Sequence, residues 1–588
     1  MLPLGEAHPW NSRVSRSAGL DRNPASWRAS PFSATGGGFT GLLAGKRLEM
    51  TSTIDDDVQK SLFVNGHDLT LREVADVAGG ALPLRLKVDP DAVSRMTDSH
   101  GLKLRLIGLG LPIYGVTTGF GDSSARQISP EKTADLQRNL VVYHLNGTGQ
   151  ESSREIVRAT LLIRANCLAR GHSGIRPALA THLLAMLEND VLPIIPERGS
   201  VGASGDLVPL CYLASAVIGV GTVRYRGRDL PATEAYEDCG MEPFVLEAKE
   251  GLALINGTSF MSAFSVLAVE GAKEIAAVAD LCTALGAQVM LGNQGHYDRF
   301  IHEQKPHPGQ LASAENISRL MRGSGLSHTQ GEVLTSDPMP SGTGYYRLDH
   351  PVQDRYSLRC APGVTGVLRD LLEWSEKWVS IEINSTNDNP LFDAGENVVR
   401  SGGNFYGGHI GQSMDGLKLA LANVADLLDR QLALIVDEKF NNGLPANLVR
   451  PVEPDDWQAG LHHGFKGMQI AASSLAAEAL KLTMPASAFS RSTEAHNQDK
   501  VSMGTIAARD ARTVLELTEQ VAAIHLLALC QAVDFRGPDL LSPGSRPAYD
   551  LVREHVPFAD GDRRMDADIH AVVALIRSGA LRKSCAVS

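Results

Sequence analysis

Residues 413–445 read SMDGLKLALANVADLLDRQLALIVDEKFNNGLP, and this stretch determines the class of fold. Apolar side chains recur in it at steps of three and four residues, which is the period of a helix with one buried face. The residues on that face are Met414, Leu417, Leu421, Val424, Leu428, Leu432 and Ile435. The segment 441–445 then supplies a glycine and a proline, so we expect the helix to end there.

Two other segments show the same period, and they add two long helices. The first contains Phe264, Leu267, Ile275, Val278, Cys282 and Leu285; the second contains Ile506, Val514, Leu517, Val521, Ile524 and Ala528. Convincing strand patterns are few. The sequence therefore predicts a mostly-α fold, with a long central helical bundle and a small mixed N-terminal region. The expected divisions are a disordered tail or misassigned start at 1–49, an N-terminal region at 50–255, the bundle at 256–535 and a C-terminal helical wrap at 536–588.

The composition excludes several classes of partner. Of the 588 residues 43% are hydrophobic and 21% are charged, values typical of globular proteins. A formal net charge of −12 disfavours nucleic acid and anionic membrane as partners. The uncharged stretches 207–223 and 251–269 contain too many breakers or polar residues to span a membrane. The seven cysteines show no paired spacing, which favours a reducing, cytoplasmic location without a disulfide framework or structural zinc.

A polar segment at 199–210, GSVGASGDLVPL, is the strongest candidate for chemistry. A phosphate loop is a weak interpretation, because no Lys-Ser/Thr follows and no clear strand precedes. A flexible turn before a helix is the plain structural interpretation. A sharper hypothesis uses Ala203-Ser204-Gly205: an unobstructed glycine nitrogen can attack the carbonyl two residues back if the chain bends tightly. Loss of two waters would then give a methylidene-imidazolone ring (MIO), which is an electrophile.

The segment resembles the signature of the aromatic amino acid ammonia-lyase family, which includes histidine, phenylalanine and tyrosine ammonia-lyases and related aminomutases. The resemblance extends from about residue 58 to the C-terminus. Further matches follow in the family's order: YGVTTGFG at 114–121, GLALINGTS at 251–259, QDRYSLR at 353–359, NSTNDNPL at 384–391, GGNF at 402–405, NNGLP at 441–445, GFKG at 464–467 and HNQDKVSMG at 496–504. So many ordered motifs make the resemblance specific.

The resemblance implies a role for each matching residue. Removing ammonia from an α-amino acid requires an electrophile that captures the amine and a base that takes the β-proton. The matching catalytic residues are Tyr114 as base, Asn256 near the electrophile and Tyr356 as a second tyrosine. The matching substrate-binding residues are Arg359 for the carboxylate, Gln353, Asn387 and Phe405 around the ring and substrate, and Lys466 and Glu494 near the amine. Without the resemblance, Tyr114 would be interpreted as a packed turn aromatic and Asn256 as a helix N-cap. Lys466 and Glu494 would be interpreted as solvated surface charges.

The expected substrate is L-tyrosine, giving trans-p-coumarate and ammonia. In members similar to this chain, the pair His144-Leu145 accompanies tyrosine, and a histidine nitrogen can bond a phenol. The bland alternative is a core histidine bonded to backbone. Gln498 stands where histidine-specific members carry Glu. Phenylalanine or histidine lyase activity and tyrosine 2,3-aminomutase activity stay open, the last because Asp122 resembles an acid in some aminomutases.

The resemblance also implies a homotetramer whose active sites are each built from several chains, acting on a small amino acid. It implies the MIO ring as the sole prosthetic group, with no metal or nucleotide. A metal enzyme is the main alternative outside the family. His296, His302 and His307 are near one another in sequence, as are His462 and His463, but their spacing matches no trusted ligand pattern. A catalytically inactive helical scaffold is the non-enzymatic alternative.

Overall fold

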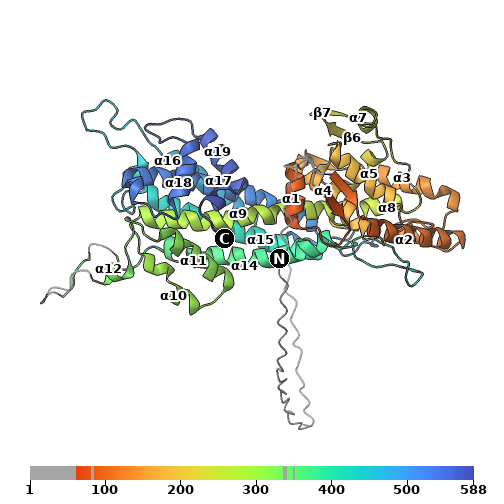
Figure 1. Ribbon diagram of the computed structural model, residues 1–588, viewed down its shortest axis with the longest axis horizontal. Coiled ribbons are helices and arrows are strands. Elements are labelled where there is room, and N and C mark those ends of the chain that lie inside the picture. The colour runs from red at the N-terminus through yellow and green to blue at the C-terminus, as the bar shows by residue number, and fades with distance from the viewer. Residues whose placement is uncertain (1–60, 81–84, 336–340, 343, 349–350, 588) are drawn as a thin grey trace, which may run out of the picture. The chain divides into compact units, whose positions relative to one another are not determined.

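A computed structural model of the chain describes residues 61–80, 85–335, 341–342, 344–348 and 351–587. The predicted tail at 1–49 lies outside these residues. Residues 59–588 form one compact unit. Long helices dominate it, which confirms the mostly-α prediction (Figure 1).

The centre of this unit is a bundle of long helices that run along its longest axis (Figure 1). Its members are α9 (Ser259–Val289), α11 (Pro308–Met321), α14 (Ala361–Ile383), α15 (Gly408–Val436), α16 (Lys466–Lys481) and α17 (Gly504–Arg536). All seven periodic residues of the 413–445 stretch are on α15, and each is at most 1% exposed. The helix ends at Val436, a few residues before the Asn-Asn-Gly segment that was expected to stop it.

α17 is packed against α9, α15 and α16. By length and composition alone it is apolar enough to cross a membrane, but 83% of its most apolar window is buried inside the molecule. Its apolar character therefore matches its position in the core.

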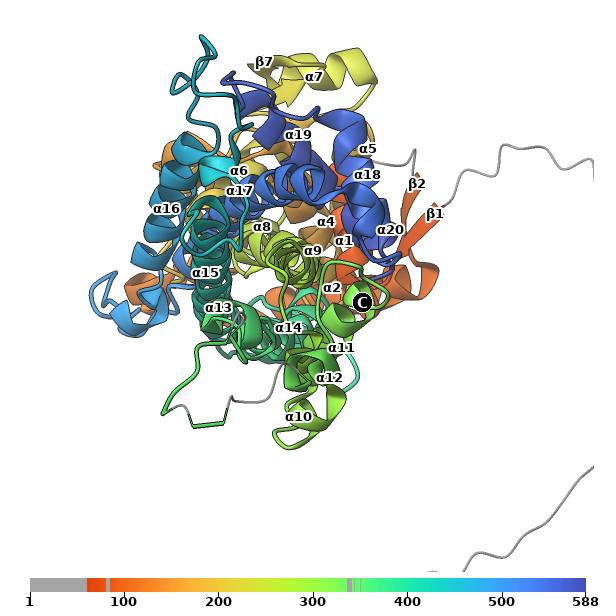
Figure 2. The ribbon, with the colours of Figure 1, turned by 90° about the vertical axis from the view of Figure 1, so that its left-hand side faces the viewer.

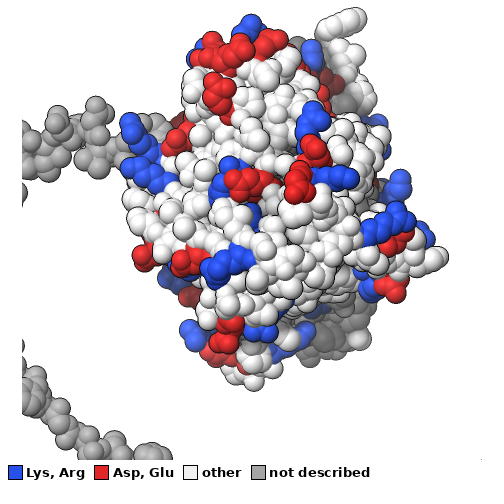
Figure 3. Space-filling model, turned by 90° about the vertical axis from the view of Figure 1, so that its right-hand side faces the viewer, with Lys and Arg blue, Asp and Glu red and all other residues white. Residues whose placement is uncertain are grey.

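On the face that Figure 3 shows, basic and acidic side chains are interspersed.

Shorter helices and small sheets surround the bundle. The N-terminal helices are α1 (Leu71–Gly79), α2 (Pro90–Gly108), α3 (Thr133–Tyr143), α4 (Arg154–Ala169), α5 (Pro177–Glu188), α6 (Leu207–Val217), α7 (Ala232–Cys239) and α8 (Glu250–Ile255). The remaining helices are α10 (Arg299–Glu303), α12 (Gln330–Leu334), α13 (Tyr356–Arg359), α18 (Arg546–His555), α19 (Asp566–Arg577) and α20 (Ala580–Ser584). The last three contact α9, α17 or one another.

The strands form small sheets rather than a continuous layer. They are β1 (Ser61–Val64), β2 (Arg85–Val88), β3 (Thr148–Glu151), β4 (Leu192–Pro193), β5 (Pro196–Arg198), β6 (Thr222–Tyr225), β7 (Arg228–Pro231), β8 (Leu391–Asp393) and β9 (Val398–Arg400). β1 and β2 pair in parallel, with Ser61 opposite Arg85. The antiparallel sheets have the orders β3-β5, β4-β6-β7 and β8-β9.

The beginnings of three bundle helices meet at one place. The backbone nitrogen of Met261, in the first turn of α9, donates to the carboxylate of Asp206 at 2.8 Å. Thr505, at the start of α17, donates to the other oxygen of that carboxylate at 2.5 Å. A methyl group added at Gly407, which precedes α15, would meet Met261. Helix N-termini carry partial positive charge, so their convergence favours negative charge nearby.

An ion pair with no solvent exposure ties the loop before α8 to the segment after α14. Lys249 Nζ donates to Asp388 Oδ2 at 2.6 Å, and both side chains are 0% exposed. Lys249→Met leaves the carboxylate buried without its partner, so we expect a loss of about 3–5 kcal/mol in unfolding free energy. The midpoint of chemical denaturation measures it.

Lys273→Met is the matched control, because the Lys273 side chain is 32% exposed in its pairs with Glu270 and Glu376. We expect it to cost about 1 kcal/mol or less. Equal midpoints for the two variants would contradict this account of the buried pair.

Candidate active site

The Ala203-Ser204-Gly205 tripeptide lies in the turn between β5 and α6, and its backbone is bent tightly. Ser204 has φ of 56° and Gly205 has φ of 79°, both in the left-handed region. A Cβ added at Gly205 would lie 2.1 Å from the Gly257 carbonyl oxygen. Only glycine fits there, because a side chain would collide with backbone. This tight bend and absent side chain are what the cyclisation hypothesis requires of the residues.

Two donors hold the carbonyl oxygen of Ser204. Asn256 Nδ2 donates to it at 2.8 Å, and the Gly257 backbone nitrogen donates at 3.3 Å. A second backbone hydrogen bond joins the same two segments: the Asp206 nitrogen donates to the Gly257 oxygen at 2.7 Å. Donors fixed around one oxygen stabilise negative charge that develops on it.

The Asp206 side chain fixes this turn to the helix bundle through Met261 and Thr505. Burial raises the pKa of its carboxyl to about 6, although the hydrogen bonds from both partners act in the opposite direction. Ser200 completes the anchor: its hydroxyl oxygen is 3.0 Å from the Thr505 hydroxyl oxygen, and it donates to the Gly205 oxygen at 3.3 Å.

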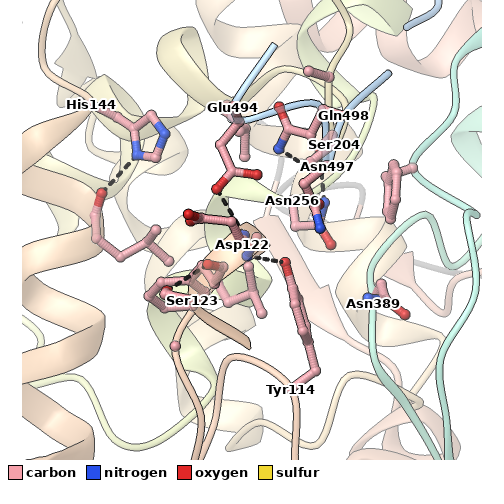
Figure 4. Close-up of a pocket in the computed structure, with 18 of the residues that line it drawn as sticks. Tyr114, Asp122, Ser123, His144, Ser204, Asn256, Asn389, Glu494, Asn497 and Gln498 are labelled. Carbon is pink, nitrogen blue, oxygen red and sulfur yellow. Dashed lines mark hydrogen bonds between the residues drawn. The ribbon is translucent and has the colours of Figure 1, made fainter. Parts of the chain in front are cut away.

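A cavity of about 900 Å³ opens in front of Ser204 (Figure 4). Nine of the residues singled out from the sequence line it: Tyr114, Asp122, His144, Ala203, Ser204, Asn256, Phe405, Glu494 and Gln498. They come from six separate stretches of chain, so the fold brings together motifs that are far apart in sequence. Gly205 continues the turn behind Ser204.

Tyr114 points into the cavity from the glycine-rich loop before α3 (Figure 4). Its hydroxyl oxygen accepts a hydrogen bond from the Gly121 nitrogen at 3.0 Å. Burial raises the pKa of Tyr114; the Gly121 bond lowers it, and the charge of Glu494 raises it further. Within one chain these groups therefore oppose the phenolate that a catalytic base requires.

Glu494 belongs to a strained loop that sequence reasoning did not foresee. Glu494, Ala495 and His496 have φ of 50°, 52° and 63°, and none of them is glycine. Such residues cost on the order of 1–3 kcal/mol each and concentrate at functional sites. The Glu494 carboxylate accepts from the Asp122 backbone nitrogen at 3.0 Å, so it joins this loop to the Tyr114 loop.

His144 is the residue that caps the C-terminal end of α3. It lines the cavity and is also hydrogen-bonded to the backbone, so it has a feature of each of the two interpretations considered for it. Its Nδ1 is 2.9 Å from the Leu140 carbonyl oxygen, which can only accept, so Nδ1 carries the proton. Burial lowers the pKa of the ring, while the Leu140 bond raises it. The neutral ring then has an acceptor at Nε2. Leu145 packs against the core and does not line the cavity.

Gln498 faces the tripeptide. Its Nε2 donates to Ser204 Oγ at 3.4 Å, and its Oε1 accepts from Thr493 at 3.1 Å. Sequence reasoning missed other lining residues with polar side chains, namely Asn139, Tyr143, Asn389, Tyr406, Asn497, Asp499 and Lys500. Asn497, Asp499 and Lys500 flank Gln498 in its motif, and Asn389 belongs to the motif at 384–391; the rest gave no distinguishing signal.

Four of the expected site residues are at the other end of the bundle from this cavity. They are Gln353, Tyr356, Arg359 and Lys466, around α13 and the start of α16 (Figure 2). Leu358 packs beside Gly286, which is 25 residues along α9 from Met261. At 1.5 Å per residue the two places are roughly 40 Å apart. Tyr356 is 71% exposed there.

The backbone around Tyr356 is held by buried side chains. Gln431 donates to the Ser357 oxygen at 2.8 Å, and Tyr297 donates to the Leu358 oxygen at 3.0 Å. Arg359 Nε donates to the Asp354 oxygen at 3.1 Å. Its guanidinium also stacks on the Tyr356 ring, 4.5 Å from the centroid. The exposed Tyr356 ring and the partly buried Arg359 are thus held in a fixed geometry.

Asn387 lies behind the tripeptide rather than in the cavity, and it is 1% exposed. It bonds Arg164 and Thr258. In the described part of the chain no three His, Cys, Asp or Glu side chains are grouped to hold a metal ion. His296 and His302 are engaged in protein hydrogen bonds, His296 with the Asp354 nitrogen and His302 with the His296 oxygen.

The fold and the tripeptide turn together define a class: a helical-bundle enzyme with an Ala-Ser-Gly loop at its helix N-termini. A sequence model of the family described as aromatic amino acid lyase matches residues 69–554. The chain belongs to this family.

Among similar proteins, the histidine ammonia-lyase of Alkaliphilus metalliredigens is 40% identical over 517 residues, which is 88% of this chain and 97% of that protein. The histidine ammonia-lyase of Gloeobacter violaceus is also 40% identical, over 88% and 96% of the two chains. Among solved structures, the tyrosine aminomutase of Streptomyces globisporus has a TM-score of 0.84 at 37% identity, covering 90% of this chain and 98% of that one.

The hydrogen bond from Asn256 to Ser204 gives a first test of the site. Asn256→Ala removes one of two donors to that oxygen, so we expect kcat to fall about 10²–10³-fold. Steady-state kinetics on an aromatic amino acid measure it. Asn139→Ala is the control, because Asn139 lines the same cavity. Similar losses in the two variants would contradict a special role for the Ser204 oxygen.

Proposed function

We propose that this enzyme eliminates ammonia from an aromatic L-amino acid without oxidation, using an MIO ring formed from its own Ala203-Ser204-Gly205. One observation carries the proposal: the left-handed Ser204-Gly205 turn faces the cavity with its Ser204 oxygen held by Asn256 and Gly257. Once formed, the ring supplies an electrophile that takes the substrate amine and makes it a better leaving group. Asn256 and Gly257 stabilise negative charge on the oxygen that Ser204 contributes.

The cavity suits the amine end of the substrate. It is lined by the carboxyl groups of Asp122, Glu494 and Asp499, while Lys500 is the lining residue with a full positive charge. A substrate carboxylate needs a cation, and Arg359 and Lys466 are at the far end of the bundle. We therefore propose that neighbouring chains of a homotetramer bring Arg359, Lys466 and Tyr356 to this cavity. The positive charges of Arg359 and Lys466 would also lower the pKa of Tyr114 toward the value that a base requires.

For the substrate we propose L-tyrosine, with L-histidine as the second candidate. An acceptor at His144 Nε2 suits a phenol hydroxyl, and Gln498 offers an imidazole less than a carboxylate would. The curated relatives named histidine ammonia-lyase favour histidine instead. An imidazole N–H could also donate to His144. The likeness to tyrosine aminomutase adds β-tyrosine as a possible product. We propose a cytoplasmic location, because all seven cysteines are free thiols.

A side-by-side assay tests the substrate. We expect p-coumarate from tyrosine at a higher kcat/KM than urocanate from histidine or cinnamate from phenylalanine. His144→Phe should shift preference toward phenylalanine, because the pocket loses its phenol partner and gains apolar surface. Chromatography of the products, including β-amino acids, gives the readout. Urocanate as the main product would replace tyrosine by histidine, and β-tyrosine would make the enzyme an aminomutase.

The role of Ser204 is tested by Ser204→Ala. Its hydroxyl makes only the 3.4 Å contact with Gln498 among the described residues, so the fold should be retained. We expect an unchanged circular dichroism spectrum and a loss of activity of at least about 10³-fold. The variant Ser123→Ala, at another serine of the cavity, serves as control. Full activity of Ser204→Ala would refute the ring mechanism.

The shared site is tested by complementation. Tyr114→Phe and Arg359→Gln should each be nearly inactive as pure proteins. If Arg359 serves a neighbouring chain, then co-expressed and co-purified mixtures contain some cavities with both native residues. We expect these mixed tetramers to recover a measurable share of wild-type kcat, and light scattering to give a tetramer mass. Fully active monomers, or no recovery in mixed oligomers, would contradict the shared site.

A further inference from the structure

A chain of four polar side chains, three of them buried and Glu382 partly buried, lies behind Gly257, outside the cavity. Arg164 Nη1, on α4, donates to Asn387 Oδ1 at 3.1 Å. Asn387 Nδ2 donates to Thr258 Oγ1 at 2.9 Å, and Thr258 Oγ1 donates to Glu382 Oε1 at 2.5 Å. The chain therefore runs from a guanidinium to a carboxyl group, past the peptide that holds Ser204.

Arg164 is the unusual member. It is 0% exposed, and it makes no ion pair within 4 Å in the described part of the chain. Its Nε has no hydrogen-bond partner there. Burial lowers the pKa of the guanidinium, with the charges of Asp388 and Asp206 acting in the opposite sense. An arginine stays protonated in proteins, so a positive charge is held in the interior without a direct counter-charge.

The carboxyl groups nearest to Arg164 already have other partners. Asp388 pairs with Lys249, and Asp206 accepts from Met261 and Thr505. Glu382 accepts from Thr258, and burial raises its pKa to about 7. An uncompensated buried cation is costly, and such groups persist where the charge has a use.

The guanidinium is directed at the peptide of Gly257. A Cβ added there would lie 2.2 Å from Arg164 Nη1 and 2.3 Å from Asn387 Oδ1, so only glycine lets the cation come this close. The backbone nitrogen of the same residue donates to the Ser204 oxygen at 3.3 Å. The positive charge therefore lies directly behind a donor to the oxygen on which negative charge collects. In a water-excluded interior this interaction is screened weakly.

We infer that Arg164 is an electrostatic positioning residue: its buried charge, set by Asn387 behind Gly257, stabilises negative charge at the Ser204 oxygen during ring formation and ammonia elimination. The inference rests on the proposed function. A purely structural role would require only a hydrogen bond to Asn387. The two roles differ in whether the charge itself matters.

Two substitutions separate charge from hydrogen bonding. Arg164→Gln keeps a donor for Asn387 without the charge, and Arg164→Lys keeps the charge. We expect the Lys variant to form the ring completely and to stay within about 10-fold of wild-type kcat. The Gln variant should form the ring more slowly, by intact mass and ultraviolet absorbance over time, and lose about 10²–10³-fold in kcat with KM changed only a few-fold. The control is Arg158→Gln, at another arginine of α4. It breaks the ion pair between Arg158 and Asp190 and should lower only thermal stability.

The wild-type mass distinguishes the two levels of the argument. A wild-type chain without the ring would refute the proposed function itself. With the ring present in wild type, equal ring formation and kcat in the Gln and Lys variants would overturn the role of the charge. A Gln variant that exceeds the Lys variant in either readout would overturn it as well.

Discussion

The hydrogen bonds between the Ser204-Gly205 turn and the Asn256-Gly257 peptide are the contact on which the rest of this molecule depends. They hold a left-handed turn in a shape that free serine rarely adopts. Contacts with the long helices offset the conformational free energy of this turn, because Asp206 joins the turn to the starts of α9 and α17. The packed helix bundle is thus the support for one strained tripeptide.

Under the proposed shared site, the single chain would contain two incomplete halves, at opposite ends of the bundle. One half has the tripeptide, Tyr114 and several acidic groups, and the electrostatics there disfavour a phenolate. The other half has an exposed Tyr356 stacked on a partly buried Arg359, on a turn held by buried side chains. Opposite charge and opposite location give the two halves a physical reason to combine between copies of the chain. Assembly would then be a requirement for catalysis rather than an addition to it.

The sequence predicted the bundle well, since the three-four period of α15 follows directly from burial of one face. It also predicted nine of the residues that line the cavity, because most of them belong to short contiguous motifs, but it missed lining residues outside those motifs, such as Asn139 and Tyr143. It could not show where Arg359 lies relative to Ser204, because motif order carries no distance. The left-handed residues 494–496 and the isolated Arg164 charge were also beyond it. Both depend on long-range packing, and neither residue type signals it.

The central claim is that the chain makes its own electrophile from Ala203-Ser204-Gly205. The most direct measurement is the mass of the purified chain, followed by the mass of the proteolytic peptide that contains these residues. The account predicts a deficit of two waters, located in that peptide and absent from the Ser204→Ala protein. A wild-type peptide at its full unmodified mass, in enzyme that is active, would contradict the account.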